Sequence, residues 1–173
     1  MAINNTFYGT TEEADDYFLN RLHEFAWTAA SAADRRKALI AARRLIDQLN
    51  FKGDRHTVYT LRQANPSATV DEIQAAEVQQ PNEFPRGADT EVPEDIRRAG
   101  YEIAHSLLDN KDAELELETL AVTSMGYGGV RTSFERSQLP IEHIVNLIPN
   151  ALAFRLLKPY LRDDDAVTLS RVS

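Results

Sequence analysis

The segment VPEDIRRAGYEIAHSLLDN, residues 92–110, predicts an amphipathic helix. Pro93 suits the first helical position, where its missing N–H has no helical partner. Glu94 and Asp95 follow it, where the helix dipole favours negative charge. Apolar residues then recur at helical spacing, at Ile96, Ala99, Ile103, Ala104, Leu107 and Leu108. One face of this helix should therefore be buried in a core, and the helix should end near residues 109–110.

A first helix is expected from residue 10 to about residue 25. Thr10 followed by Glu13 fits a capping box, in which hydroxyl and carboxylate each accept a free backbone N–H. The apolar positions of this segment are Ala14, Phe18, Leu22 and Phe25. The connection to the next helix is short, which favours antiparallel packing of the two, with Trp27 wedged into the corner.

A second helix is expected from residue 31 to about residue 50. Ser31 with Asp34 is its start signal, and Gly53 is a plausible stop. Its apolar stripe consists of Ala38, Leu39, Ala42, Leu45, Ile46 and Leu49. A last helix is expected over 149–161, where Pro159 should kink or end it. Its predicted apolar positions are Leu152, Leu156, Leu157 and Leu161.

Residues 54–91 break the helical pattern and predict a long extended arm. Asn65-Pro66, Pro81 and Pro85 punctuate this segment, with one short helix expected from a Thr69 cap to about Glu77. A connection this long with so few apolar residues is typical of a functional or a disordered segment. We expect such an arm to become ordered only on contact with neighbouring subunits.

Residues 117–135 predict a β-hairpin insertion. Leu120, Val122 and Ser124 alternate, as do Val130, Thr132 and Phe134, and the glycine-rich stretch 126–129 supplies a turn. A hairpin alone is marginal in water, so it should pair with another element or another subunit.

The expected fold is mainly α: a small antiparallel helical bundle in one domain, residues 1–173. Its helical core covers 10–53, 92–110 and 149–161, and residues 162–173 form a flexible tail.

The composition of the chain excludes several kinds of binding site and several classes of protein. The 173 residues carry a net charge of −8 and no cysteine, so disulfides and thiolate metal sites are excluded. No apolar run approaches the roughly 20 residues that span a bilayer, and the N-terminus does not resemble a secretion signal, so we expect a protein made in a cytoplasm with no membrane partner. The net negative charge of the chain also disfavours tight nonspecific binding to DNA, because DNA is negative too. The same repulsion is compatible with a surface along which DNA slides without sticking.

The second helix is the basic exception. Its cationic residues are Arg35, Arg36, Lys37, Arg43 and Arg44. They suggest either a DNA-binding stripe or a helix face paired with acidic residues of the first helix or of a neighbouring subunit; the acidic remainder of the chain favours pairing.

No motif indicates an enzyme, a metal site or a cofactor. The histidines at positions 23, 56, 105 and 143 lack the convergent ligands of a zinc site. His105 is better interpreted as a structural partner of a nearby carboxylate. The stretch GYGG at 126–129 lacks the Gly-Lys-Ser/Thr ending of a phosphate loop. We therefore predict no catalytic, cofactor-binding or metal-binding residues.

Several stretches resemble one family in their order and spacing. The opening YGTTEEADDYF, residues 8–18, is similar to the start of tailed-phage head–tail connector subunits, a group sometimes labelled DnaT-like. Further similar stretches are Trp27, ALIAA at 38–42, LID at 45–47, FKG at 51–53, FPR at 84–86, VPEDIRRA at 92–99, EIA at 102–104 and LLKPYL at 156–161. Two departures are the longer segment 53–85 and Phe84, where such proteins often carry tryptophan.

The resemblance implies a structural protein of the virion neck that forms a ring of about twelve copies below the portal. Such a ring extends the DNA channel and docks the tail, so the implied partners are the protein itself, the portal protein, tail or tail-completion proteins and passing genomic DNA. Two alternatives stay open: a DNA-binding, primosome-like accessory protein, and a small-molecule-binding regulatory domain with a polar pocket.

Overall fold

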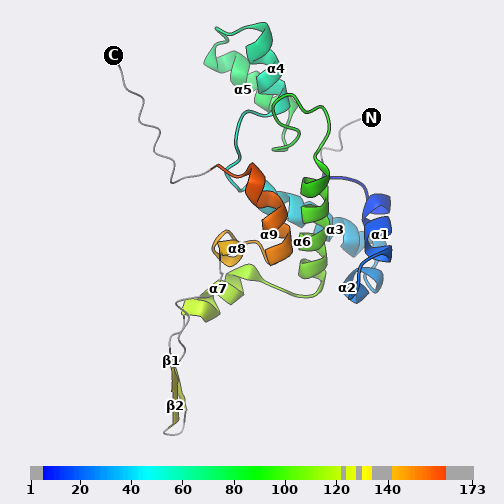
Figure 1. The fold of residues 1–173 in the computed structure, drawn as a ribbon, viewed down its shortest axis with the longest axis vertical. Coiled ribbons are helices and arrows are strands. Elements are labelled where there is room, and N and C mark those ends of the chain that lie inside the picture. The colour runs from blue at the N-terminus through cyan, green and yellow to red at the C-terminus, as the bar shows by residue number, and fades with distance from the viewer. Residues whose placement is uncertain (1–5, 122–123, 128–129, 134–141, 163–173) are drawn as a thin grey trace.

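The computed structural model describes residues 6–121, 124–127, 130–133 and 142–162, and the side chains of these residues except 119–133. The fold is mainly helical, and its centre is α6 (Glu94–Leu108). Helices α3 (Ala32–Asp47) and α9 (Ala151–Leu157) pack on α6. Figure 1 shows α6 upright, with α9 on one flank and α1 and α2 on the other.

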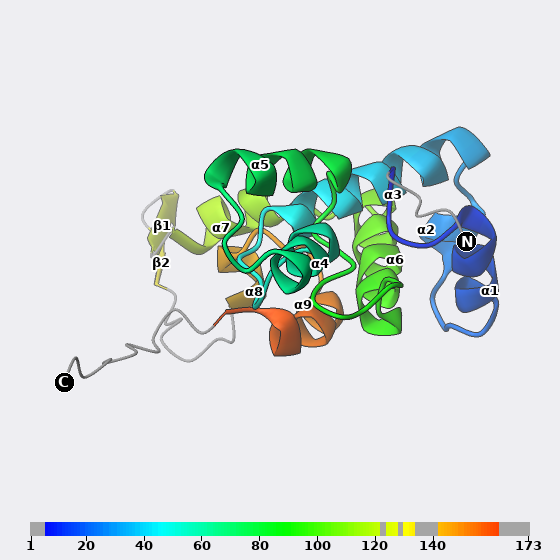
Figure 2. The same cartoon turned by 90° about the horizontal axis from the view of Figure 1, so that it is seen from above.

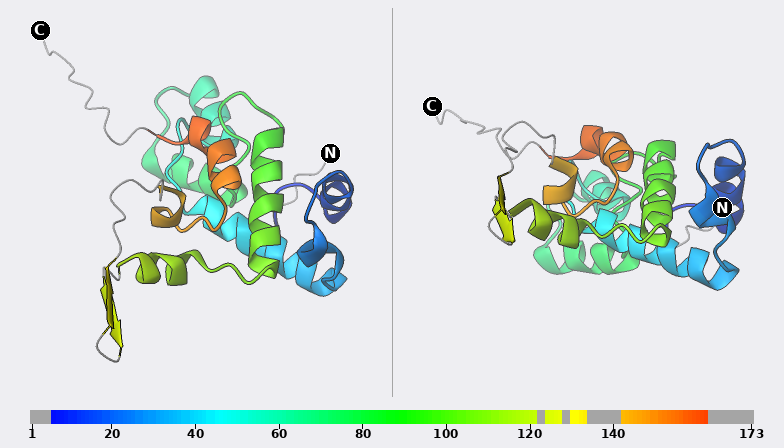
Figure 3. Two further views of the ribbon diagram at one scale, coloured as in Figure 1. Left: turned by 60° about the horizontal axis from the view of Figure 1, so that its bottom comes forward. Right: turned by 90° about the horizontal axis from the view of Figure 1, so that it is seen from below.

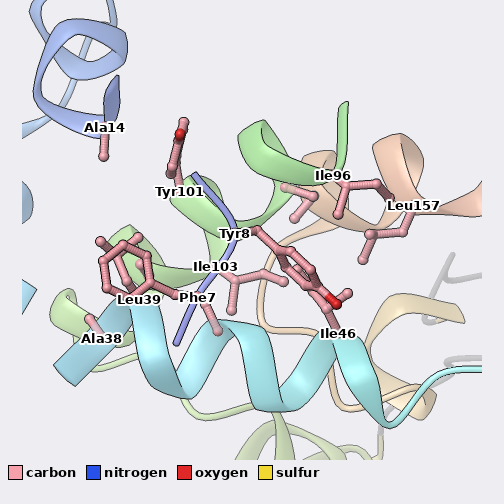
Figure 4. Packing of buried hydrophobic residues seen from close by; sticks show 14 of the residues in the cluster. Phe7, Tyr8, Ala14, Ala38, Leu39, Ile46, Ile96, Tyr101, Ile103 and Leu157 are labelled. Carbon is pink, nitrogen blue, oxygen red and sulfur yellow. The ribbon is translucent and has the colours of Figure 1, made fainter. Parts of the chain in front are cut away.

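The predicted stripe of α6 is the middle of the core. Ile96, Ala99, Ile103 and Ala104 are fully buried, and Leu107 and Leu108 pack on the core's edge. Ala38, Leu39, Ala42 and Ile46 of α3 face them, as the second predicted stripe requires. Figure 4 shows Ile46, Ile103 and Leu157 on three different helices, and Phe7 and Tyr8 on the N-terminal segment, which contributes to the same cluster.

The first helix is shorter than predicted. Helix α1 (Thr11–Leu19) begins at the expected capping box but ends at Asn20, and α2 (Phe25–Thr28) follows after a turn. His23 in this turn has a φ of 60°, which no helix accommodates. Leu22 and Phe25 are therefore exposed instead of buried. The expected antiparallel pairing of the first two long helices is also wrong, because α3 packs mainly on α6.

The predicted extended arm is a helical hairpin. Helix α5 (Val70–Gln79) was expected and has the predicted Thr69 cap, whereas α4 (His56–Ala64) was missed. The two helices pack on each other and project from the body at one end (Figure 1). The base of the hairpin folds onto its own chain: Phe84 is 1% exposed and contacts Phe51. This base needs no neighbour to be ordered, contrary to the expectation for the arm.

The region predicted as a hairpin begins with a helix. Alternating Glu and Leu at 114–118 belong to α7 (Ala113–Ala121), and Asp112 accepts the N–H of Glu114 at 2.9 Å. The strand expected at Leu120 is therefore wrong, because strong helix formers continue to that point. Strands β1 (Ser124–Tyr127) and β2 (Val130–Ser133) pair antiparallel beyond it. Val122, residues 128–129 and Phe134 lie outside the described residues, and docking of this element on a neighbour stays a prediction.

The chain returns to α6 through α8 (Glu142–Val145) and α9. Asn150 caps α9 and also reaches Ser106 of α6. Pro159 changes the helix to a 3₁₀ turn, η1 (Lys158–Tyr160), as expected for proline at this point. Of the predicted stripe Leu157 is buried but Leu152 is exposed, and Phe154 takes the buried place. The predicted tail from residue 163 lies outside the described residues.

Candidate interaction surfaces

The turn between α1 and α2 displays three large apolar side chains. Leu19, Leu22 and Phe25 are 80%, 83% and 78% exposed. We call these three residues the α1–α2 face. Carboxylates that form no ion pair within the described part of the chain surround it, namely Glu12, Asp16 and Glu24. The face is thus apolar at its centre and negative at its rim.

A buried ion pair holds this turn in place. Glu102 of α6 has a fully buried carboxylate, and Arg21 in the turn donates to it with two nitrogens, at 2.7 and 2.9 Å. Tyr17 donates to the same carboxylate at 2.7 Å and Asn150 at 3.2 Å. Burial, and then the hydrogen bond to Glu102, raise the pKa of Tyr17 to about 12. Arg21 therefore points inward while its apolar neighbours point out.

A second group of contacts holds α2 in place. Trp27 is 1% exposed, as expected for the corner, and its indole N–H donates to Asp15 at 2.7 Å. Arg35 of α3 donates to the same carboxylate at 3.0 Å and to the Trp27 carbonyl at 2.9 Å. The Trp27 ring stacks on Phe18 with centroids 4.8 Å apart. These contacts fix a turn whose outer side chains are apolar, and contiguous exposed apolar surface is typical of an interaction site.

A groove continues the α1–α2 face. It has a volume of about 700 Å³ and runs between α2, α3 and the end of α6. Its lining includes the small or apolar residues Phe25, Ala29, Ala41 and Leu108, together with the charged residues Asp34, Lys37 and Asp109. The exposed apolar surface therefore extends beyond the turn itself.

A different face lies on the outer side of α9 and η1. Leu152 is 46% exposed and Pro159 is exposed beside it. We call the exposed residues Leu152, Arg155, Lys158, Pro159 and Arg162 the α9 face. Within the described residues, Arg155 and Arg162 form no ion pair, while Lys158 pairs with Glu142 at 2.7 Å. Lys52 donates to the Pro159 carbonyl at 3.4 Å and adds a cation to this face, while the acidic residues Asp89, Glu91 and Glu94 lie around Tyr160 at its η1 end.

The α4–α5 hairpin exposes Val70 and Val78. Its base is held by a network of ion pairs and hydrogen bonds, which we call the polar lock. Glu83 accepts from both Arg55 and Arg86, and the Phe84–Pro85 bond inside this lock is cis. Gln80 is 3% exposed and donates to the Pro85 carbonyl at 2.7 Å. The lock fixes where the hairpin leaves the body.

A tyrosine joins the same region to α3. The Tyr8 hydroxyl donates to Asp47, and burial, then the Asp47 charge, raise the pKa of Tyr8 well above its usual range. Burial likewise raises the pKa of Asp47. Arg43 donates to Asp47 at 2.8 Å and to Asn82 at 3.0 Å. These are structural contacts between α3 and the hairpin base.

The basic residues of α3 are mostly paired. Arg35 pairs with Asp15 of the first helix, as the pairing interpretation expected, while Arg43 pairs with Asp47 and Lys37 with Asp34 on α3 itself. Arg36 and Arg44 are exposed and form no ion pair within the described ranges. The five cations therefore do not form one free stripe.

A groove of about 560 Å³ between α1 and α6 is the nearest feature to a polar pocket. Its charged side chains largely satisfy one another: Glu13 accepts from Arg97 at 2.9 Å, and Glu94 accepts from Arg98 at 2.6 Å. Tyr101 donates to Glu13 at 3.0 Å. These paired groups offer little to a small molecule.

The histidines do not converge. His105 stacks on Phe18 with centroids 5.4 Å apart, and its Nε2 has no hydrogen-bond partner in the described structure. Burial, and then the charge of Arg21, lower the pKa of His105. Within the described residues no ion pair joins His105 to a carboxylate, so the expected partner is not found. In the part of the chain that is described, no three His, Asp or Glu side chains group as metal ligands would.

In the described residues, no helix has both the length and the apolar character needed to cross a bilayer. The sequence predicted α5 but not α4, and it did not predict the α1–α2 face, because Leu22 and Phe25 were assigned to a core. The signal available was Asn20-Arg21, a polar pair that interrupts the predicted stripe.

No family model, curated protein or solved structure matches the chain.

Proposed function

We propose that this chain is a structural head–tail connector of a tailed phage. It is made in the host cytoplasm and enters the virion neck, where it forms a ring below the portal, extends the DNA channel and docks the tail. It acts without catalysis and without a cofactor. The observation that carries this proposal is the α1–α2 face, because a buried ion pair and a buried tryptophan hold large apolar side chains in solvent.

Such a face supports an assembly role on physical grounds. Exposed apolar side chains contribute nothing to the stability of an isolated subunit, whereas burying them in a contact releases about 25 cal/mol for each Å² removed from water. The resemblance in the sequence supplies the kind of assembly, namely the portal, the tail and about twelve copies. The net charge of −8 is compatible with DNA that passes without sticking.

The proposal is tested by mixing the purified protein with its portal protein. Light scattering after size exclusion should show a complex of many copies, and negative-stain images should show a second ring beneath the portal. Leu22→Ser should weaken the assembly, while Val78→Ser, equally exposed on α5, serves as the matched control. A protein that stays monomeric with the portal present would reject the connector role.

The DNA-binding alternative keeps one observation in its favour. Arg36 and Arg44 are exposed cations on α3 without an ion pair in the described chain. Two such residues give few phosphate contacts, so any binding should be weak and lost at moderate salt. Gel shifts with wild type and with Arg36→Glu/Arg44→Glu test this role. Tight binding at physiological salt that the double variant abolishes would favour the alternative.

A further inference from the structure

We propose that the α1–α2 face of one copy docks on the α9 face of the next copy, head to tail. This inference rests on the proposed ring and names the contact that builds it. The occupant of the α1–α2 face is therefore a second copy of this chain.

Charge complementarity is the first argument. Residues 10–30 carry five acidic side chains and one basic one, Arg21, which points inward to Glu102. Residues 142–162 carry three basic side chains and one acidic one, Glu142, and three aspartates follow at 163–165, so the positive part of the α9 face is the part around Arg155. The α1–α2 face thus has a negative rim, and on the α9 face the exposed Leu152 lies one helical turn from Arg155, a cation without an ion pair in the described residues. Two like faces would repel, so the pairing of unlike faces is favoured.

The placement of the faces is the second argument. Helices α1 and α2 lie on one flank of α6 and α9 lies on the other, in views from above and from below (Figures 2 and 3). The two faces therefore cannot meet within one copy. Contacts between unlike faces of successive copies propagate, and they close into a ring when the rotation between copies allows it.

The surroundings of Tyr160 limit where the contact lies. Asp89, Glu91 and Glu94 line a groove together with Tyr160, so this end of η1 has negative neighbours. The negative α1–α2 face is therefore expected to seat over Leu152 and Arg155, farther from Tyr160. This gives a specific pair of positions to test, Leu22 and Leu152.

Cross-linking tests the pair directly, because the chain has no cysteine of its own. Leu22→Cys and Leu152→Cys are made singly and together, mixed with a cysteine-free portal, and treated with a short bismaleimide. The double variant should give a covalent ladder of many copies. The two single variants mixed together should give dimers only, and each alone should give none. Val78→Cys with Leu152→Cys is the matched control, since Val78 lies on neither face.

A charge swap tests complementarity separately. Asp16→Arg or Arg155→Glu should each raise the protein concentration needed for assembly roughly fivefold or more, since every contact in the ring loses an attraction and gains a repulsion. The variant carrying both changes should recover. A mixture of the single variants should also assemble, as alternating copies present only opposite charges. Arg36→Glu, exposed on α3, is the control and should assemble as wild type.

The outcomes separate the contact from the ring. Rings in electron micrographs with no cross-link between positions 22 and 152 would overturn the contact and leave the connector role standing. Dimers from a single cysteine variant would overturn it too, because like faces would then meet. Absence of any wild-type assembly with the portal would overturn both proposals.

Discussion

Removing Arg21 should leave a charge stranded inside the protein. In Arg21→Met the side chain keeps much of its length and apolar stem, but the Glu102 carboxylate loses two charged hydrogen bonds. The Glu102 side chain is 0% exposed, so water cannot replace them. The same change should loosen the turn that holds the α1–α2 face.

The size of the effect follows from the full burial of Glu102 and the partial burial of Arg21. Removing one partner of a buried pair costs about 3–5 kcal/mol. Arg21 is 24% exposed, and Tyr17 and Asn150 still donate to Glu102, so we expect the lower end, about 3 kcal/mol. For a chain of 173 residues this corresponds to a melting temperature lower by roughly 6–12 °C.

Urea denaturation followed by the fluorescence of the single tryptophan, Trp27, measures this loss. Arg98→Met is the matched control on α6, because its pair with Glu94 is exposed and should be worth about 0.5 kcal/mol or less. The variant Arg21→Met/Glu102→Gln removes the stranded charge and should be more stable than Arg21→Met by about 2 kcal/mol. A double variant no more stable than Arg21→Met would refute the electrostatic explanation.

Three further outcomes are expected. Phe84→Ala should cost about 3–5 kcal/mol in unfolding free energy because the ring is buried among aromatic neighbours, whereas Val78→Ala on the exposed hairpin should cost about 0.5 kcal/mol or less; equal losses in urea titrations would be inconsistent with this packing. Tyr17 keeps its proton in the folded state up to about pH 12, while an unfolded tyrosine loses it near 10, so stability should be fully present below about pH 10 and fall between about 10 and 12, with a shallower fall in Tyr17→Phe; identical pH profiles would contradict it. Gly9→Ala should cost about 1–3 kcal/mol by thermal melting, since Gly9 has a φ of +82° and a Cβ there would overlap the Tyr101 hydroxyl; an unchanged melting temperature would count against this geometry.

Periodicity predicted the central packing well. The stripes of α3 and α6 were located from sequence because both helices bury one continuous face along their length. The caps at Thr10, Ser31 and Thr69 were also predicted correctly, since a cap depends on residues only three positions apart. These features are local, and local rules are sufficient for them.

The errors came from contacts between distant residues. Arg21 meets Glu102 across 81 positions, a contact that the spacing of Leu22 and Phe25 does not reveal. The arm was misjudged similarly, because Phe84 is buried by Phe51 and Tyr8, which spacing alone does not bring together. The α1–α2 face went unnoticed for the same reason.

The two chain segments that lead into and out of the α4–α5 hairpin lie against each other. The N–H of His56 reaches the Pro85 carbonyl at 3.0 Å, and the N–H of Gly87 reaches the Asp54 carbonyl at 2.9 Å. The helices α4 and α5 therefore leave the body and return to it at one place, and the apex near Pro66 can accept an inserted peptide tag at a cost that grows only slowly with its length. A tag placed there is therefore expected to report on the molecule without entering its core.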